Sequence, residues 1–153
     1  MCEPAQLIIP RLWLGDRNSA ADGKFLRNNN ITVVFNCTKD LPFHSSVTRR
    51  YRLPVDDNLE PEEIENMERW APEAVYKVLA EYNSGRSILI HCHAGMQRSA
   101  ALMTMTLHVL SGHPIDGLVE FIQNKRPIAF RPGKNFGKAM YGFETLCKSY
   151  VKQ

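Results

Sequence analysis

Short apolar runs bounded by turn-forming residues recur along the first part of the chain, a pattern typical of β-strands. Pro10 stands between the first two runs and favours a turn or the edge of a sheet. The run that begins at Ile31 is almost continuously apolar, as expected of a central strand covered on both faces. We predict strands over Leu7–Ile9, Leu12–Leu14, Ile31–Phe35, Tyr51–Val55 and Ile88–Ile90, with a hairpin between the first two.

Apolar residues recur at helical spacing in the remaining segments. A first helix should follow Asn18 or Ser19, either of which is a suitable N-cap, and should end at the asparagines 28–30. Pro72 lies inside the longest helical segment and should kink it or start a second helix there. The further predicted helices cover about Pro61–Tyr82, Arg98–Ser111, Pro114–Lys125 and Gly137–Val151.

Strands that alternate with helices, followed by a helical C-terminal half, predict an α/β fold. The 153 residues suit one domain over 1–153, with a core from about 7 to 150. We expect a central, mainly parallel sheet flanked by helices. No apolar run is long enough to cross a membrane, so no membrane span is expected.

Composition indicates the compartment and the state of the cysteines. Residues 1–4 lack the basic start and apolar core of a secretory signal, which predicts a reducing compartment. We expect the cytoplasm or the nucleus, or a virion or host cytoplasm if the protein is viral. The four cysteines are then expected to be thiols, and without C-x-x-C spacing they predict no zinc site. The net charge of +3 suits anionic partners, but solubility explains it equally well.

The stretch Ile88–Leu102 carries the candidate chemistry. A buried strand, a tight loop and a helix are predicted in turn, so the loop ends at a helix N-terminus whose free amides and dipole favour an anion. Cys92 in this loop should be a thiolate, because the amides, the dipole and the nearby Arg98 all favour its charged form. Gly95 permits a tight turn, and the guanidinium of Arg98 suits two oxygens of a phosphate.

The sequence His91-Cys92-x-x-Gly95-x-x-Arg98-Ser99 resembles the signature loop of the cysteine-dependent protein tyrosine phosphatase superfamily. Within it, the short chain is similar to the dual-specificity phosphatases, as a compact atypical or viral-type member, and the fold of that family is implied. The similarity extends from about Leu7 to Tyr150 through Ile9–Gly15, Ile31–Asn36, Arg126–Ile128 and Phe143–Glu144. The segment Ala129–Asn135 departs from the family, which usually has a shorter turn with an asparagine near a proline.

The resemblance implies catalysis through a cysteinyl-phosphate intermediate, with Cys92 as the nucleophile. Phosphate would be held by the amides and the guanidinium of the phosphate loop, which comprises His93, Ala94, Gly95, Met96, Gln97 and Arg98. Ser99 would hydrogen-bond the sulfur and make it a better leaving group, and capping of the following helix is an equal alternative. His91 would support the geometry of the loop.

The resemblance also places a general acid on a loop after an upstream strand. Asp57 takes this role by the pattern Pro-Val-x-Asp-Asn, and Asp56 is the alternative. The same aspartate, once deprotonated, would activate the water that hydrolyses the intermediate. The other interpretation of the pair is that both carboxylates merely cap the helix that follows.

Cys37 ends a predicted strand that should neighbour the catalytic one. Some relatives protect the nucleophile by a reversible disulfide with a cysteine in such a place. Cys37 is therefore a candidate redox partner of Cys92, and a plain buried thiol is the alternative.

Phosphorylated proteins are the substrates that the resemblance implies, with phosphotyrosine and phosphoserine or phosphothreonine both hydrolysed. We expect no cofactor and no metal, and either a monomer or a homodimer. RNA 5′-triphosphatases and polynucleotide phosphatases of the same fold are an alternative, although the triphosphatases favour Thr-His after the cysteine, where this chain has His93-Ala94. Nucleic acid is thus disfavoured but left open. A phosphoprotein-binding pseudophosphatase is the other alternative, but such a protein would lack the nucleophile or the acid.

Overall fold

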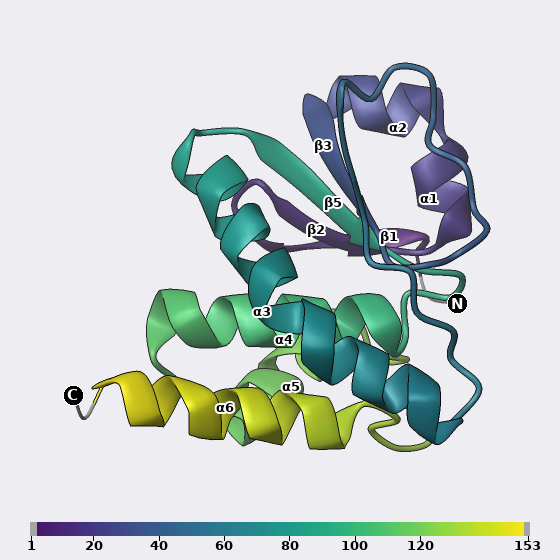
Figure 1. Cartoon of the computed structure of the whole chain (residues 1–153). Coiled ribbons are helices and arrows are strands. Elements are labelled where there is room, and N and C mark those ends of the chain that lie inside the picture. The colour runs from purple at the N-terminus through teal and green to yellow at the C-terminus, as the bar shows by residue number, and fades with distance from the viewer. Residues whose placement is uncertain (1–2, 152–153) are drawn as a thin grey trace.

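The computed structural model describes residues 3–151, which are arranged in three layers with a sheet in the middle (Figure 1). The sheet has five strands in the order β1-β2-β5-β3-β4. They are β1 Ala5–Ile9, β2 Leu12–Gly15, β3 Ile31–Asn36, β4 Arg49–Arg52 and β5 Ser87–His91. β1 is antiparallel to β2, and the other neighbouring pairs are parallel. The predicted N-terminal hairpin and the mainly parallel sheet are confirmed.

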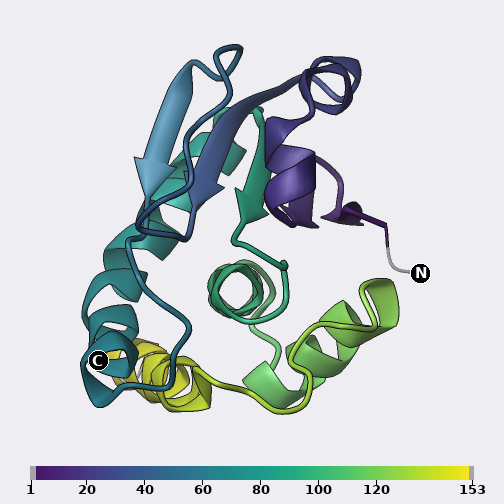
Figure 2. The same ribbon diagram turned by 90° about the vertical axis from the view of Figure 1, so that its right-hand side faces the viewer.

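Helices cover both faces of the sheet, as predicted. They are α1 Arg17–Ala21, α2 Gly23–Asn28, α3 Pro61–Asn83, α4 Arg98–Ser111, α5 Ile115–Lys125 and α6 Gly137–Val151. α1 and α2 lie on one face, and the other four lie on the opposite face (Figure 1). Figure 2 looks along α4, which has α3, α6 and α5 around it. Within residues 3–151, no helix is both long and apolar enough to span a bilayer.

β5 and α4 form the centre of the molecule. Ile88 and Ile90 belong to the larger apolar core on the side of α3 to α6, whereas Leu89 belongs to the smaller core beneath α1 and α2. A strand buried on both faces needs apolar residues at every position, which explains the continuous run in the sequence. Every residue of α4 from Arg98 to His108 is also buried. The loop between β5 and α4 is therefore held by buried elements on either side.

The helix predicted after Asn18 or Ser19 is in fact two short helices. Asp16 caps the first, because its Oδ1 accepts hydrogen bonds from the amides of Asn18 (2.9 Å) and Ser19 (3.0 Å). Asp22 has an extended backbone between the two helices, and its Oδ1 accepts from the amide of Phe25 (3.1 Å). Each aspartate satisfies free amides at a helix start, so the predicted N-cap is wrong and the helix restarts at Asp22.

The strand predicted over Tyr51–Val55 begins earlier and ends at Arg52. The amide of Leu53 still donates to Asn36 O (2.9 Å), but Pro54 has no N–H with which to continue the ladder. Residues 53–55 therefore leave the sheet and lead into the loop that carries Asp56 and Asp57.

α3 is a single helix through Pro72, so a second helix starting there is wrong. Figure 1 shows that α3 bends part-way along its length. A proline inside a helix removes one main-chain hydrogen bond and commonly causes such a bend. The N-terminal half of α3 comes directly after the loop that carries Asp56 and Asp57, and it borders one side of the candidate site.

Candidate active site

The signature loop lies at the carboxyl end of the central strand β5, directly before α4. Cys92 is only 2% exposed. The carbonyls of the five residues after Cys92 all accept hydrogen bonds from outside the loop. Three of these bonds come from backbone amides: Arg17 N to His93 O (3.0 Å), Phe130 N to Met96 O (2.8 Å) and Ala101 N to Gln97 O (2.8 Å). Carbonyls that point outward turn the N–H groups of the same peptide units inward, which makes a concave site for an anion.

The other two loop carbonyls are held by Arg126, whose side chain is 1% exposed. Its Nε donates to Gly95 O and its Nη2 to Ala94 O, both at 2.9 Å. Gly95 has a φ of 67°, and a Cβ at this position would lie 2.6 Å from Gly15 O. Glycine is therefore required at 95, both for the left-handed backbone and for the close approach of the two chains.

The environment of Cys92 favours its thiolate. Its Sγ lies 3.1 Å from Ser99 Oγ. Burial raises the pKa of Cys92, but hydrogen bonds from the hydroxyl and amide of Ser99, the charge of Arg98 and the amide of Gly95 outweigh it, so the net pKa is lowered. The N-cap of α4 is Gln97, and Ser99 lies inside the first turn with its hydroxyl on the sulfur. The capping alternative for Ser99 is therefore wrong.

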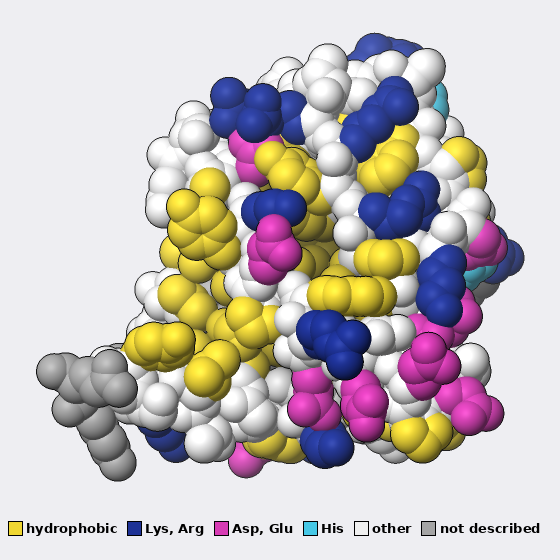
Figure 3. Space-filling model, viewed as in Figure 1, with side chains coloured by type: hydrophobic (Ala, Val, Ile, Leu, Met, Phe, Trp, Pro, Cys, Tyr) yellow, Lys and Arg dark blue, Asp and Glu magenta, His cyan; other side chains and the backbone are white. Residues whose placement is uncertain are grey.

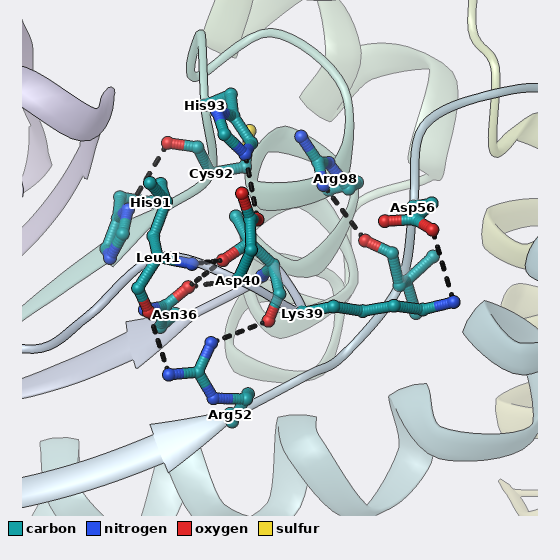
Figure 4. A network of polar contacts seen from close by, with 12 residues as sticks. Asn36, Lys39, Asp40, Leu41, Arg52, Asp56, His91, Cys92, His93 and Arg98 are labelled. Carbon is teal, nitrogen blue, oxygen red and sulfur yellow. Dashed lines mark hydrogen bonds and ion pairs between the residues drawn. The ribbon is translucent and has the colours of Figure 1, made fainter.

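Arg98 points into the site with donors to spare (Figure 4). Its side chain is held by one hydrogen bond, from Nη1 to Val55 O (3.0 Å). Its Nε is buried and finds no acceptor among residues 3–151. A buried charged donor without a partner is costly unless a ligand completes it. The guanidinium is thus arranged to receive an anion beside Cys92.

Asp56 and Asp57 have different partners. Asp56 Oδ2 lies 3.2 Å from Lys39 Nζ (Figure 4), and the Asp56 amide donates to Glu63 Oε1 on α3 (3.1 Å). Asp57 Oδ1 instead accepts a hydrogen bond from Asn135 Nδ2 (2.8 Å). α3 has Glu60 at its N-cap, so neither aspartate caps it and that interpretation is wrong. Asp56 is bound to Lys39, whereas Asp57 is exposed and is linked to Gln97 of the phosphate loop through Asn135.

His91 is buried, with Nδ1 3.2 Å from Cys92 O. Burial lowers the pKa of His91 to about 4, so its imidazole is neutral near pH 7. His93 lies in the loop itself, and its Nε2 is 3.0 Å from Asp40 Oδ1 (Figure 4). The neutral imidazole of His91 lies against the backbone of Cys92, as that of a supporting residue would, and His93 ties the phosphate loop to the segment after β3.

Within residues 3–151, no group of three or more His, Cys, Asp or Glu side chains could hold a metal ion. The described site is therefore built from one thiol, one guanidinium, backbone amides and the two aspartates.

A family model for the dual-specificity phosphatase catalytic domain matches residues 12–146 of the chain. The chain belongs to the dual-specificity phosphatase family. Human dual specificity protein phosphatase 2 is 31% identical over 143 residues, which are 92% of this chain and 44% of that protein. Human dual specificity protein phosphatase 4 is 29% identical over 139 residues, which are 90% of this chain and 34% of that protein. The chain thus spans less than half the length of these relatives.

Solved structures of the family share the fold. Human DUSP28 superposes with a TM-score of 0.84 at 22% identity, over 95% of this chain and 96% of that one. The human tyrosine phosphatase-like serine/threonine/tyrosine-interacting protein superposes with a TM-score of 0.79 at 22% identity, over 94% and 97% of the two chains. The fold and the predicted family are therefore confirmed.

Two supporting residues of the candidate site, Arg126 and Asn135, were missed by the sequence analysis, and Gln97 was predicted only as a member of the phosphate loop. Arg126 holds the loop carbonyls from behind, as described above. Gln97 anchors the segment that departs from the family: its Nε2 donates to Gly133 O (2.7 Å) and to Arg131 O (3.1 Å). Its Oε1 accepts from the amide of Asn135 (3.0 Å), the residue that contacts Asp57. One signal in the sequence could have identified Asn135: it lies close to Pro132, and the family usually has an asparagine near a proline in this turn.

Cys37 follows β3 next to the nucleophile, because its amide donates to His91 O (2.8 Å). Burial and the proximity of Cys92 raise the pKa of Cys37, so it stays a thiol while Cys92 ionises. This difference suits a pair in which an oxidised Cys92 is captured by a neighbouring thiol. Cys147 lies on α6, and Cys2 lies outside the described residues.

We predict that Cys37 protects Cys92 from irreversible oxidation. After brief exposure to hydrogen peroxide, dithiothreitol should restore most of the activity of the wild type and of Cys147→Ser, but little of that of Cys37→Ser. Peroxide oxidises Cys92 to a sulfenic acid, which condenses with the Cys37 thiol and releases water, and dithiothreitol reduces the resulting disulfide. Peptide mapping without reductant measures the bridge directly. A sulfinic acid at Cys92 in the wild type, with no bridge to Cys37, would show that Cys37 is an ordinary buried thiol.

Proposed function

We propose that this chain is a dual-specificity protein phosphatase that hydrolyses phosphotyrosine and phosphoserine or phosphothreonine. The observation that carries the proposal is the surroundings of Cys92: a thiol of lowered pKa, a ring of inward-facing amides and an Arg98 Nε without a partner among the described residues. A phosphate monoester dianion would satisfy these donors together.

In the first step, the Cys92 thiolate attacks phosphorus in line with the leaving oxygen. The S–P bond forms as the P–O bond to the substrate breaks, and Asp57 transfers its proton to the departing alkoxide or phenolate. Arg98 and the loop amides hold the three equatorial oxygens of the phosphoryl group, where charge must be stabilised throughout.

In the second step, deprotonated Asp57 takes a proton from water, whose oxygen attacks the phosphocysteine. The S–P bond breaks and phosphate leaves, while the Ser99 hydroxyl at 3.1 Å stabilises the departing thiolate. We assign the acid and base role to Asp57 because Asp56 is bound to Lys39 and its amide is bound to Glu63.

The two alternatives are less well supported. A binding module without activity has no need of both an ionised nucleophile and an acid, and this chain carries Cys92, Arg98 and Asp57. The human structure named above as phosphatase-like and interacting has the same fold, so the fold alone does not separate an enzyme from a binding protein. An RNA 5′-triphosphatase is less favoured because His93-Ala94 follows the cysteine.

A comparison of substrates tests the proposal. We expect turnover of p-nitrophenyl phosphate and of both phosphotyrosine and phosphothreonine peptides, with little release of phosphate from 5′-triphosphorylated RNA. Preference for the RNA by orders of magnitude would move the function to nucleic-acid ends. Binding of phosphopeptides without hydrolysis of any substrate would indicate a binding module.

We also propose that the protein acts in the cytoplasm or the nucleus. A thiolate nucleophile needs a reducing compartment to stay active, and the cytoplasm and the nucleus maintain such conditions.

A further inference from the structure

A groove between β4 and α3 lies outside the phosphate site. Figure 3 shows it as a hollow with an apolar floor, on the face where α3 crosses in front of the sheet. Its volume is about 360 Å³, within the range of ligand sites. Phe35 and Tyr51 stack in it with ring centroids 4.5 Å apart, and α3 contributes Trp70 and Ala74 to its lining. At the rim, Lys77 and Glu73 form an ion pair (3.3 Å), and Arg50 and Arg52 also line the groove, so its charged residues are mainly basic.

β4 is the edge strand of the sheet and pairs only with β3 within the described chain. The amide of Leu53 donates to Asn36 O in β3. In a parallel strand the N–H and C=O groups of alternate residues point to the same side, so the backbone groups of Tyr51 also point toward β3. The N–H and C=O groups of Arg50 and Arg52 point the other way, away from the sheet. This outer edge opens into the groove, since Arg50, Tyr51 and Arg52 all line it.

Charged side chains often protect an edge strand from pairing, but here they are turned away. Arg50 Nε donates to Val47 O (3.0 Å), and the guanidinium of Arg52 donates to Thr38 O (2.9 Å) and Leu41 O (2.8 Å). Both side chains therefore lie on the face of the sheet opposite α3. On the side of α3, Arg49 is paired with Glu81 and Lys77 lies over the ring of Tyr51, so the outward backbone groups of Arg50 and Arg52 are not covered by their own side chains.

The segment that lines the end of the groove leads along the chain into the candidate site. Leu53 and Pro54 line its end, and the next residue, Val55, accepts the hydrogen bond from Arg98. Asp56 and Asp57 follow directly. A chain that enters the phosphate site at Cys92 has a short path along residues 53–55 to reach the groove.

We propose that this groove binds an extended segment of the substrate protein, which adds a strand to the edge of β4 beside the phosphorylated residue. Unpaired backbone N–H and C=O groups on a strand edge, facing a helix across an apolar floor, match the main-chain groups and alternate side chains of an extended peptide. The segment presents apolar side chains at alternate positions toward Trp70 and Tyr51. This inference rests on the proposed function, because the occupant is the flank of a phosphorylated substrate.

The test compares phosphothreonine peptides with short flanks against peptides with one flank of about ten residues of alternating valine and serine, which reach roughly 33 Å when extended. The long flank is placed before the phosphothreonine in one series and after it in another. In one of the two series, kcat/KM should rise about tenfold with the long flank, as two or more added hydrogen bonds imply. Hydrolysis of p-nitrophenyl phosphate is the reference, because this small substrate does not reach the groove.

Variants of Arg50 separate the backbone amide from the side chain. Arg50→Pro removes the outward N–H and should lose about fivefold of kcat/KM with the long peptide, whereas Arg50→Ala keeps the amide and should retain the gain. Trp70→Ala should reduce the gain, and Tyr76→Ala is its control, because Tyr76 lies on the same helix, is 73% exposed and does not line the groove. Unchanged hydrolysis of p-nitrophenyl phosphate by all four variants shows that they are folded.

The outcomes separate the two proposals. If p-nitrophenyl phosphate is hydrolysed but neither long flank raises kcat/KM, or if Arg50→Pro and Arg50→Ala behave alike, the groove does not bind substrate as a strand. If no phosphate ester is hydrolysed at all, the proposed phosphatase function itself is wrong, and this inference falls with it.

Discussion

Cys92→Ser should lower kcat for p-nitrophenyl phosphate by on the order of 10⁵-fold or more. The surroundings lower the pKa of the Cys92 thiol and so favour its thiolate, whereas a serine hydroxyl in the same place stays protonated, so the in-line attack loses its nucleophile. The loop amides and Arg98 remain, and a phosphopeptide should therefore still bind. The measurement is steady-state kinetics, paired with phosphopeptide binding by calorimetry.

The control for this variant is its thermal unfolding. Serine has nearly the shape of cysteine, so the midpoint of unfolding should change by only a few degrees despite the burial of the site. A folded Cys92→Ser protein that retains a few per cent of wild-type turnover would contradict the assignment of Cys92 as the nucleophile.

Asp57→Asn should lower kcat/KM, which reports the steps up to P–O cleavage, by roughly 10²- to 10³-fold for phosphothreonine peptides and much less for p-nitrophenyl phosphate. An alkoxide leaving group needs a proton as the P–O bond breaks, whereas a nitrophenolate leaves without one. Steady-state kinetics with the two substrates measure the difference.

The matched control for Asp57→Asn is Asp56→Asn. Asp56 lies beside Asp57 but is bound to Lys39, so its replacement should reduce kcat/KM by less than about fivefold, with a modest loss of stability from one half-exposed ion pair. An equal or larger loss of kcat/KM in Asp56→Asn, with the same dependence on the leaving group, would transfer the acid role to Asp56.

Features that depend on neighbouring residues were predicted well from the sequence. The bounds of α4 and α6 follow from helix periodicity, from Gly112 directly after α4 and from the break at Pro132 and Gly133 before α6. The sequence from His91 to Ser99 is contiguous, so its pattern could be read locally. The strand β5 was identified for a similar reason, because burial on both faces leaves a continuous apolar run.

Two kinds of feature were not predicted from the sequence: the choice among several possible helix caps, and contacts between residues far apart in the chain. Asp16 and Asp22 cap two helices where the sequence offered several equivalent capping residues, and only the backbone geometry decides between them. The contact from Asn135 to Asp57 joins residues 78 positions apart, and the bonds from Arg126 to the loop carbonyls span 31 and 32 positions. No local pattern contains such pairs, and they are the contacts that shape the rim and the back of the site.

The covalent intermediate is the central claim, and trapping it is the most direct test. Asp57→Asn should be mixed with excess p-nitrophenyl phosphate, quenched in acid and mapped by mass spectrometry. Its first step is fast because nitrophenolate needs no proton, and its second step is slow because water lacks its general base, so the intermediate accumulates. We predict one phosphoryl group on the peptide that contains Cys92, absent from the double variant Cys92→Ser/Asp57→Asn. Continued turnover by Asp57→Asn with no phosphoryl group on Cys92, or with one on another residue, would contradict the account.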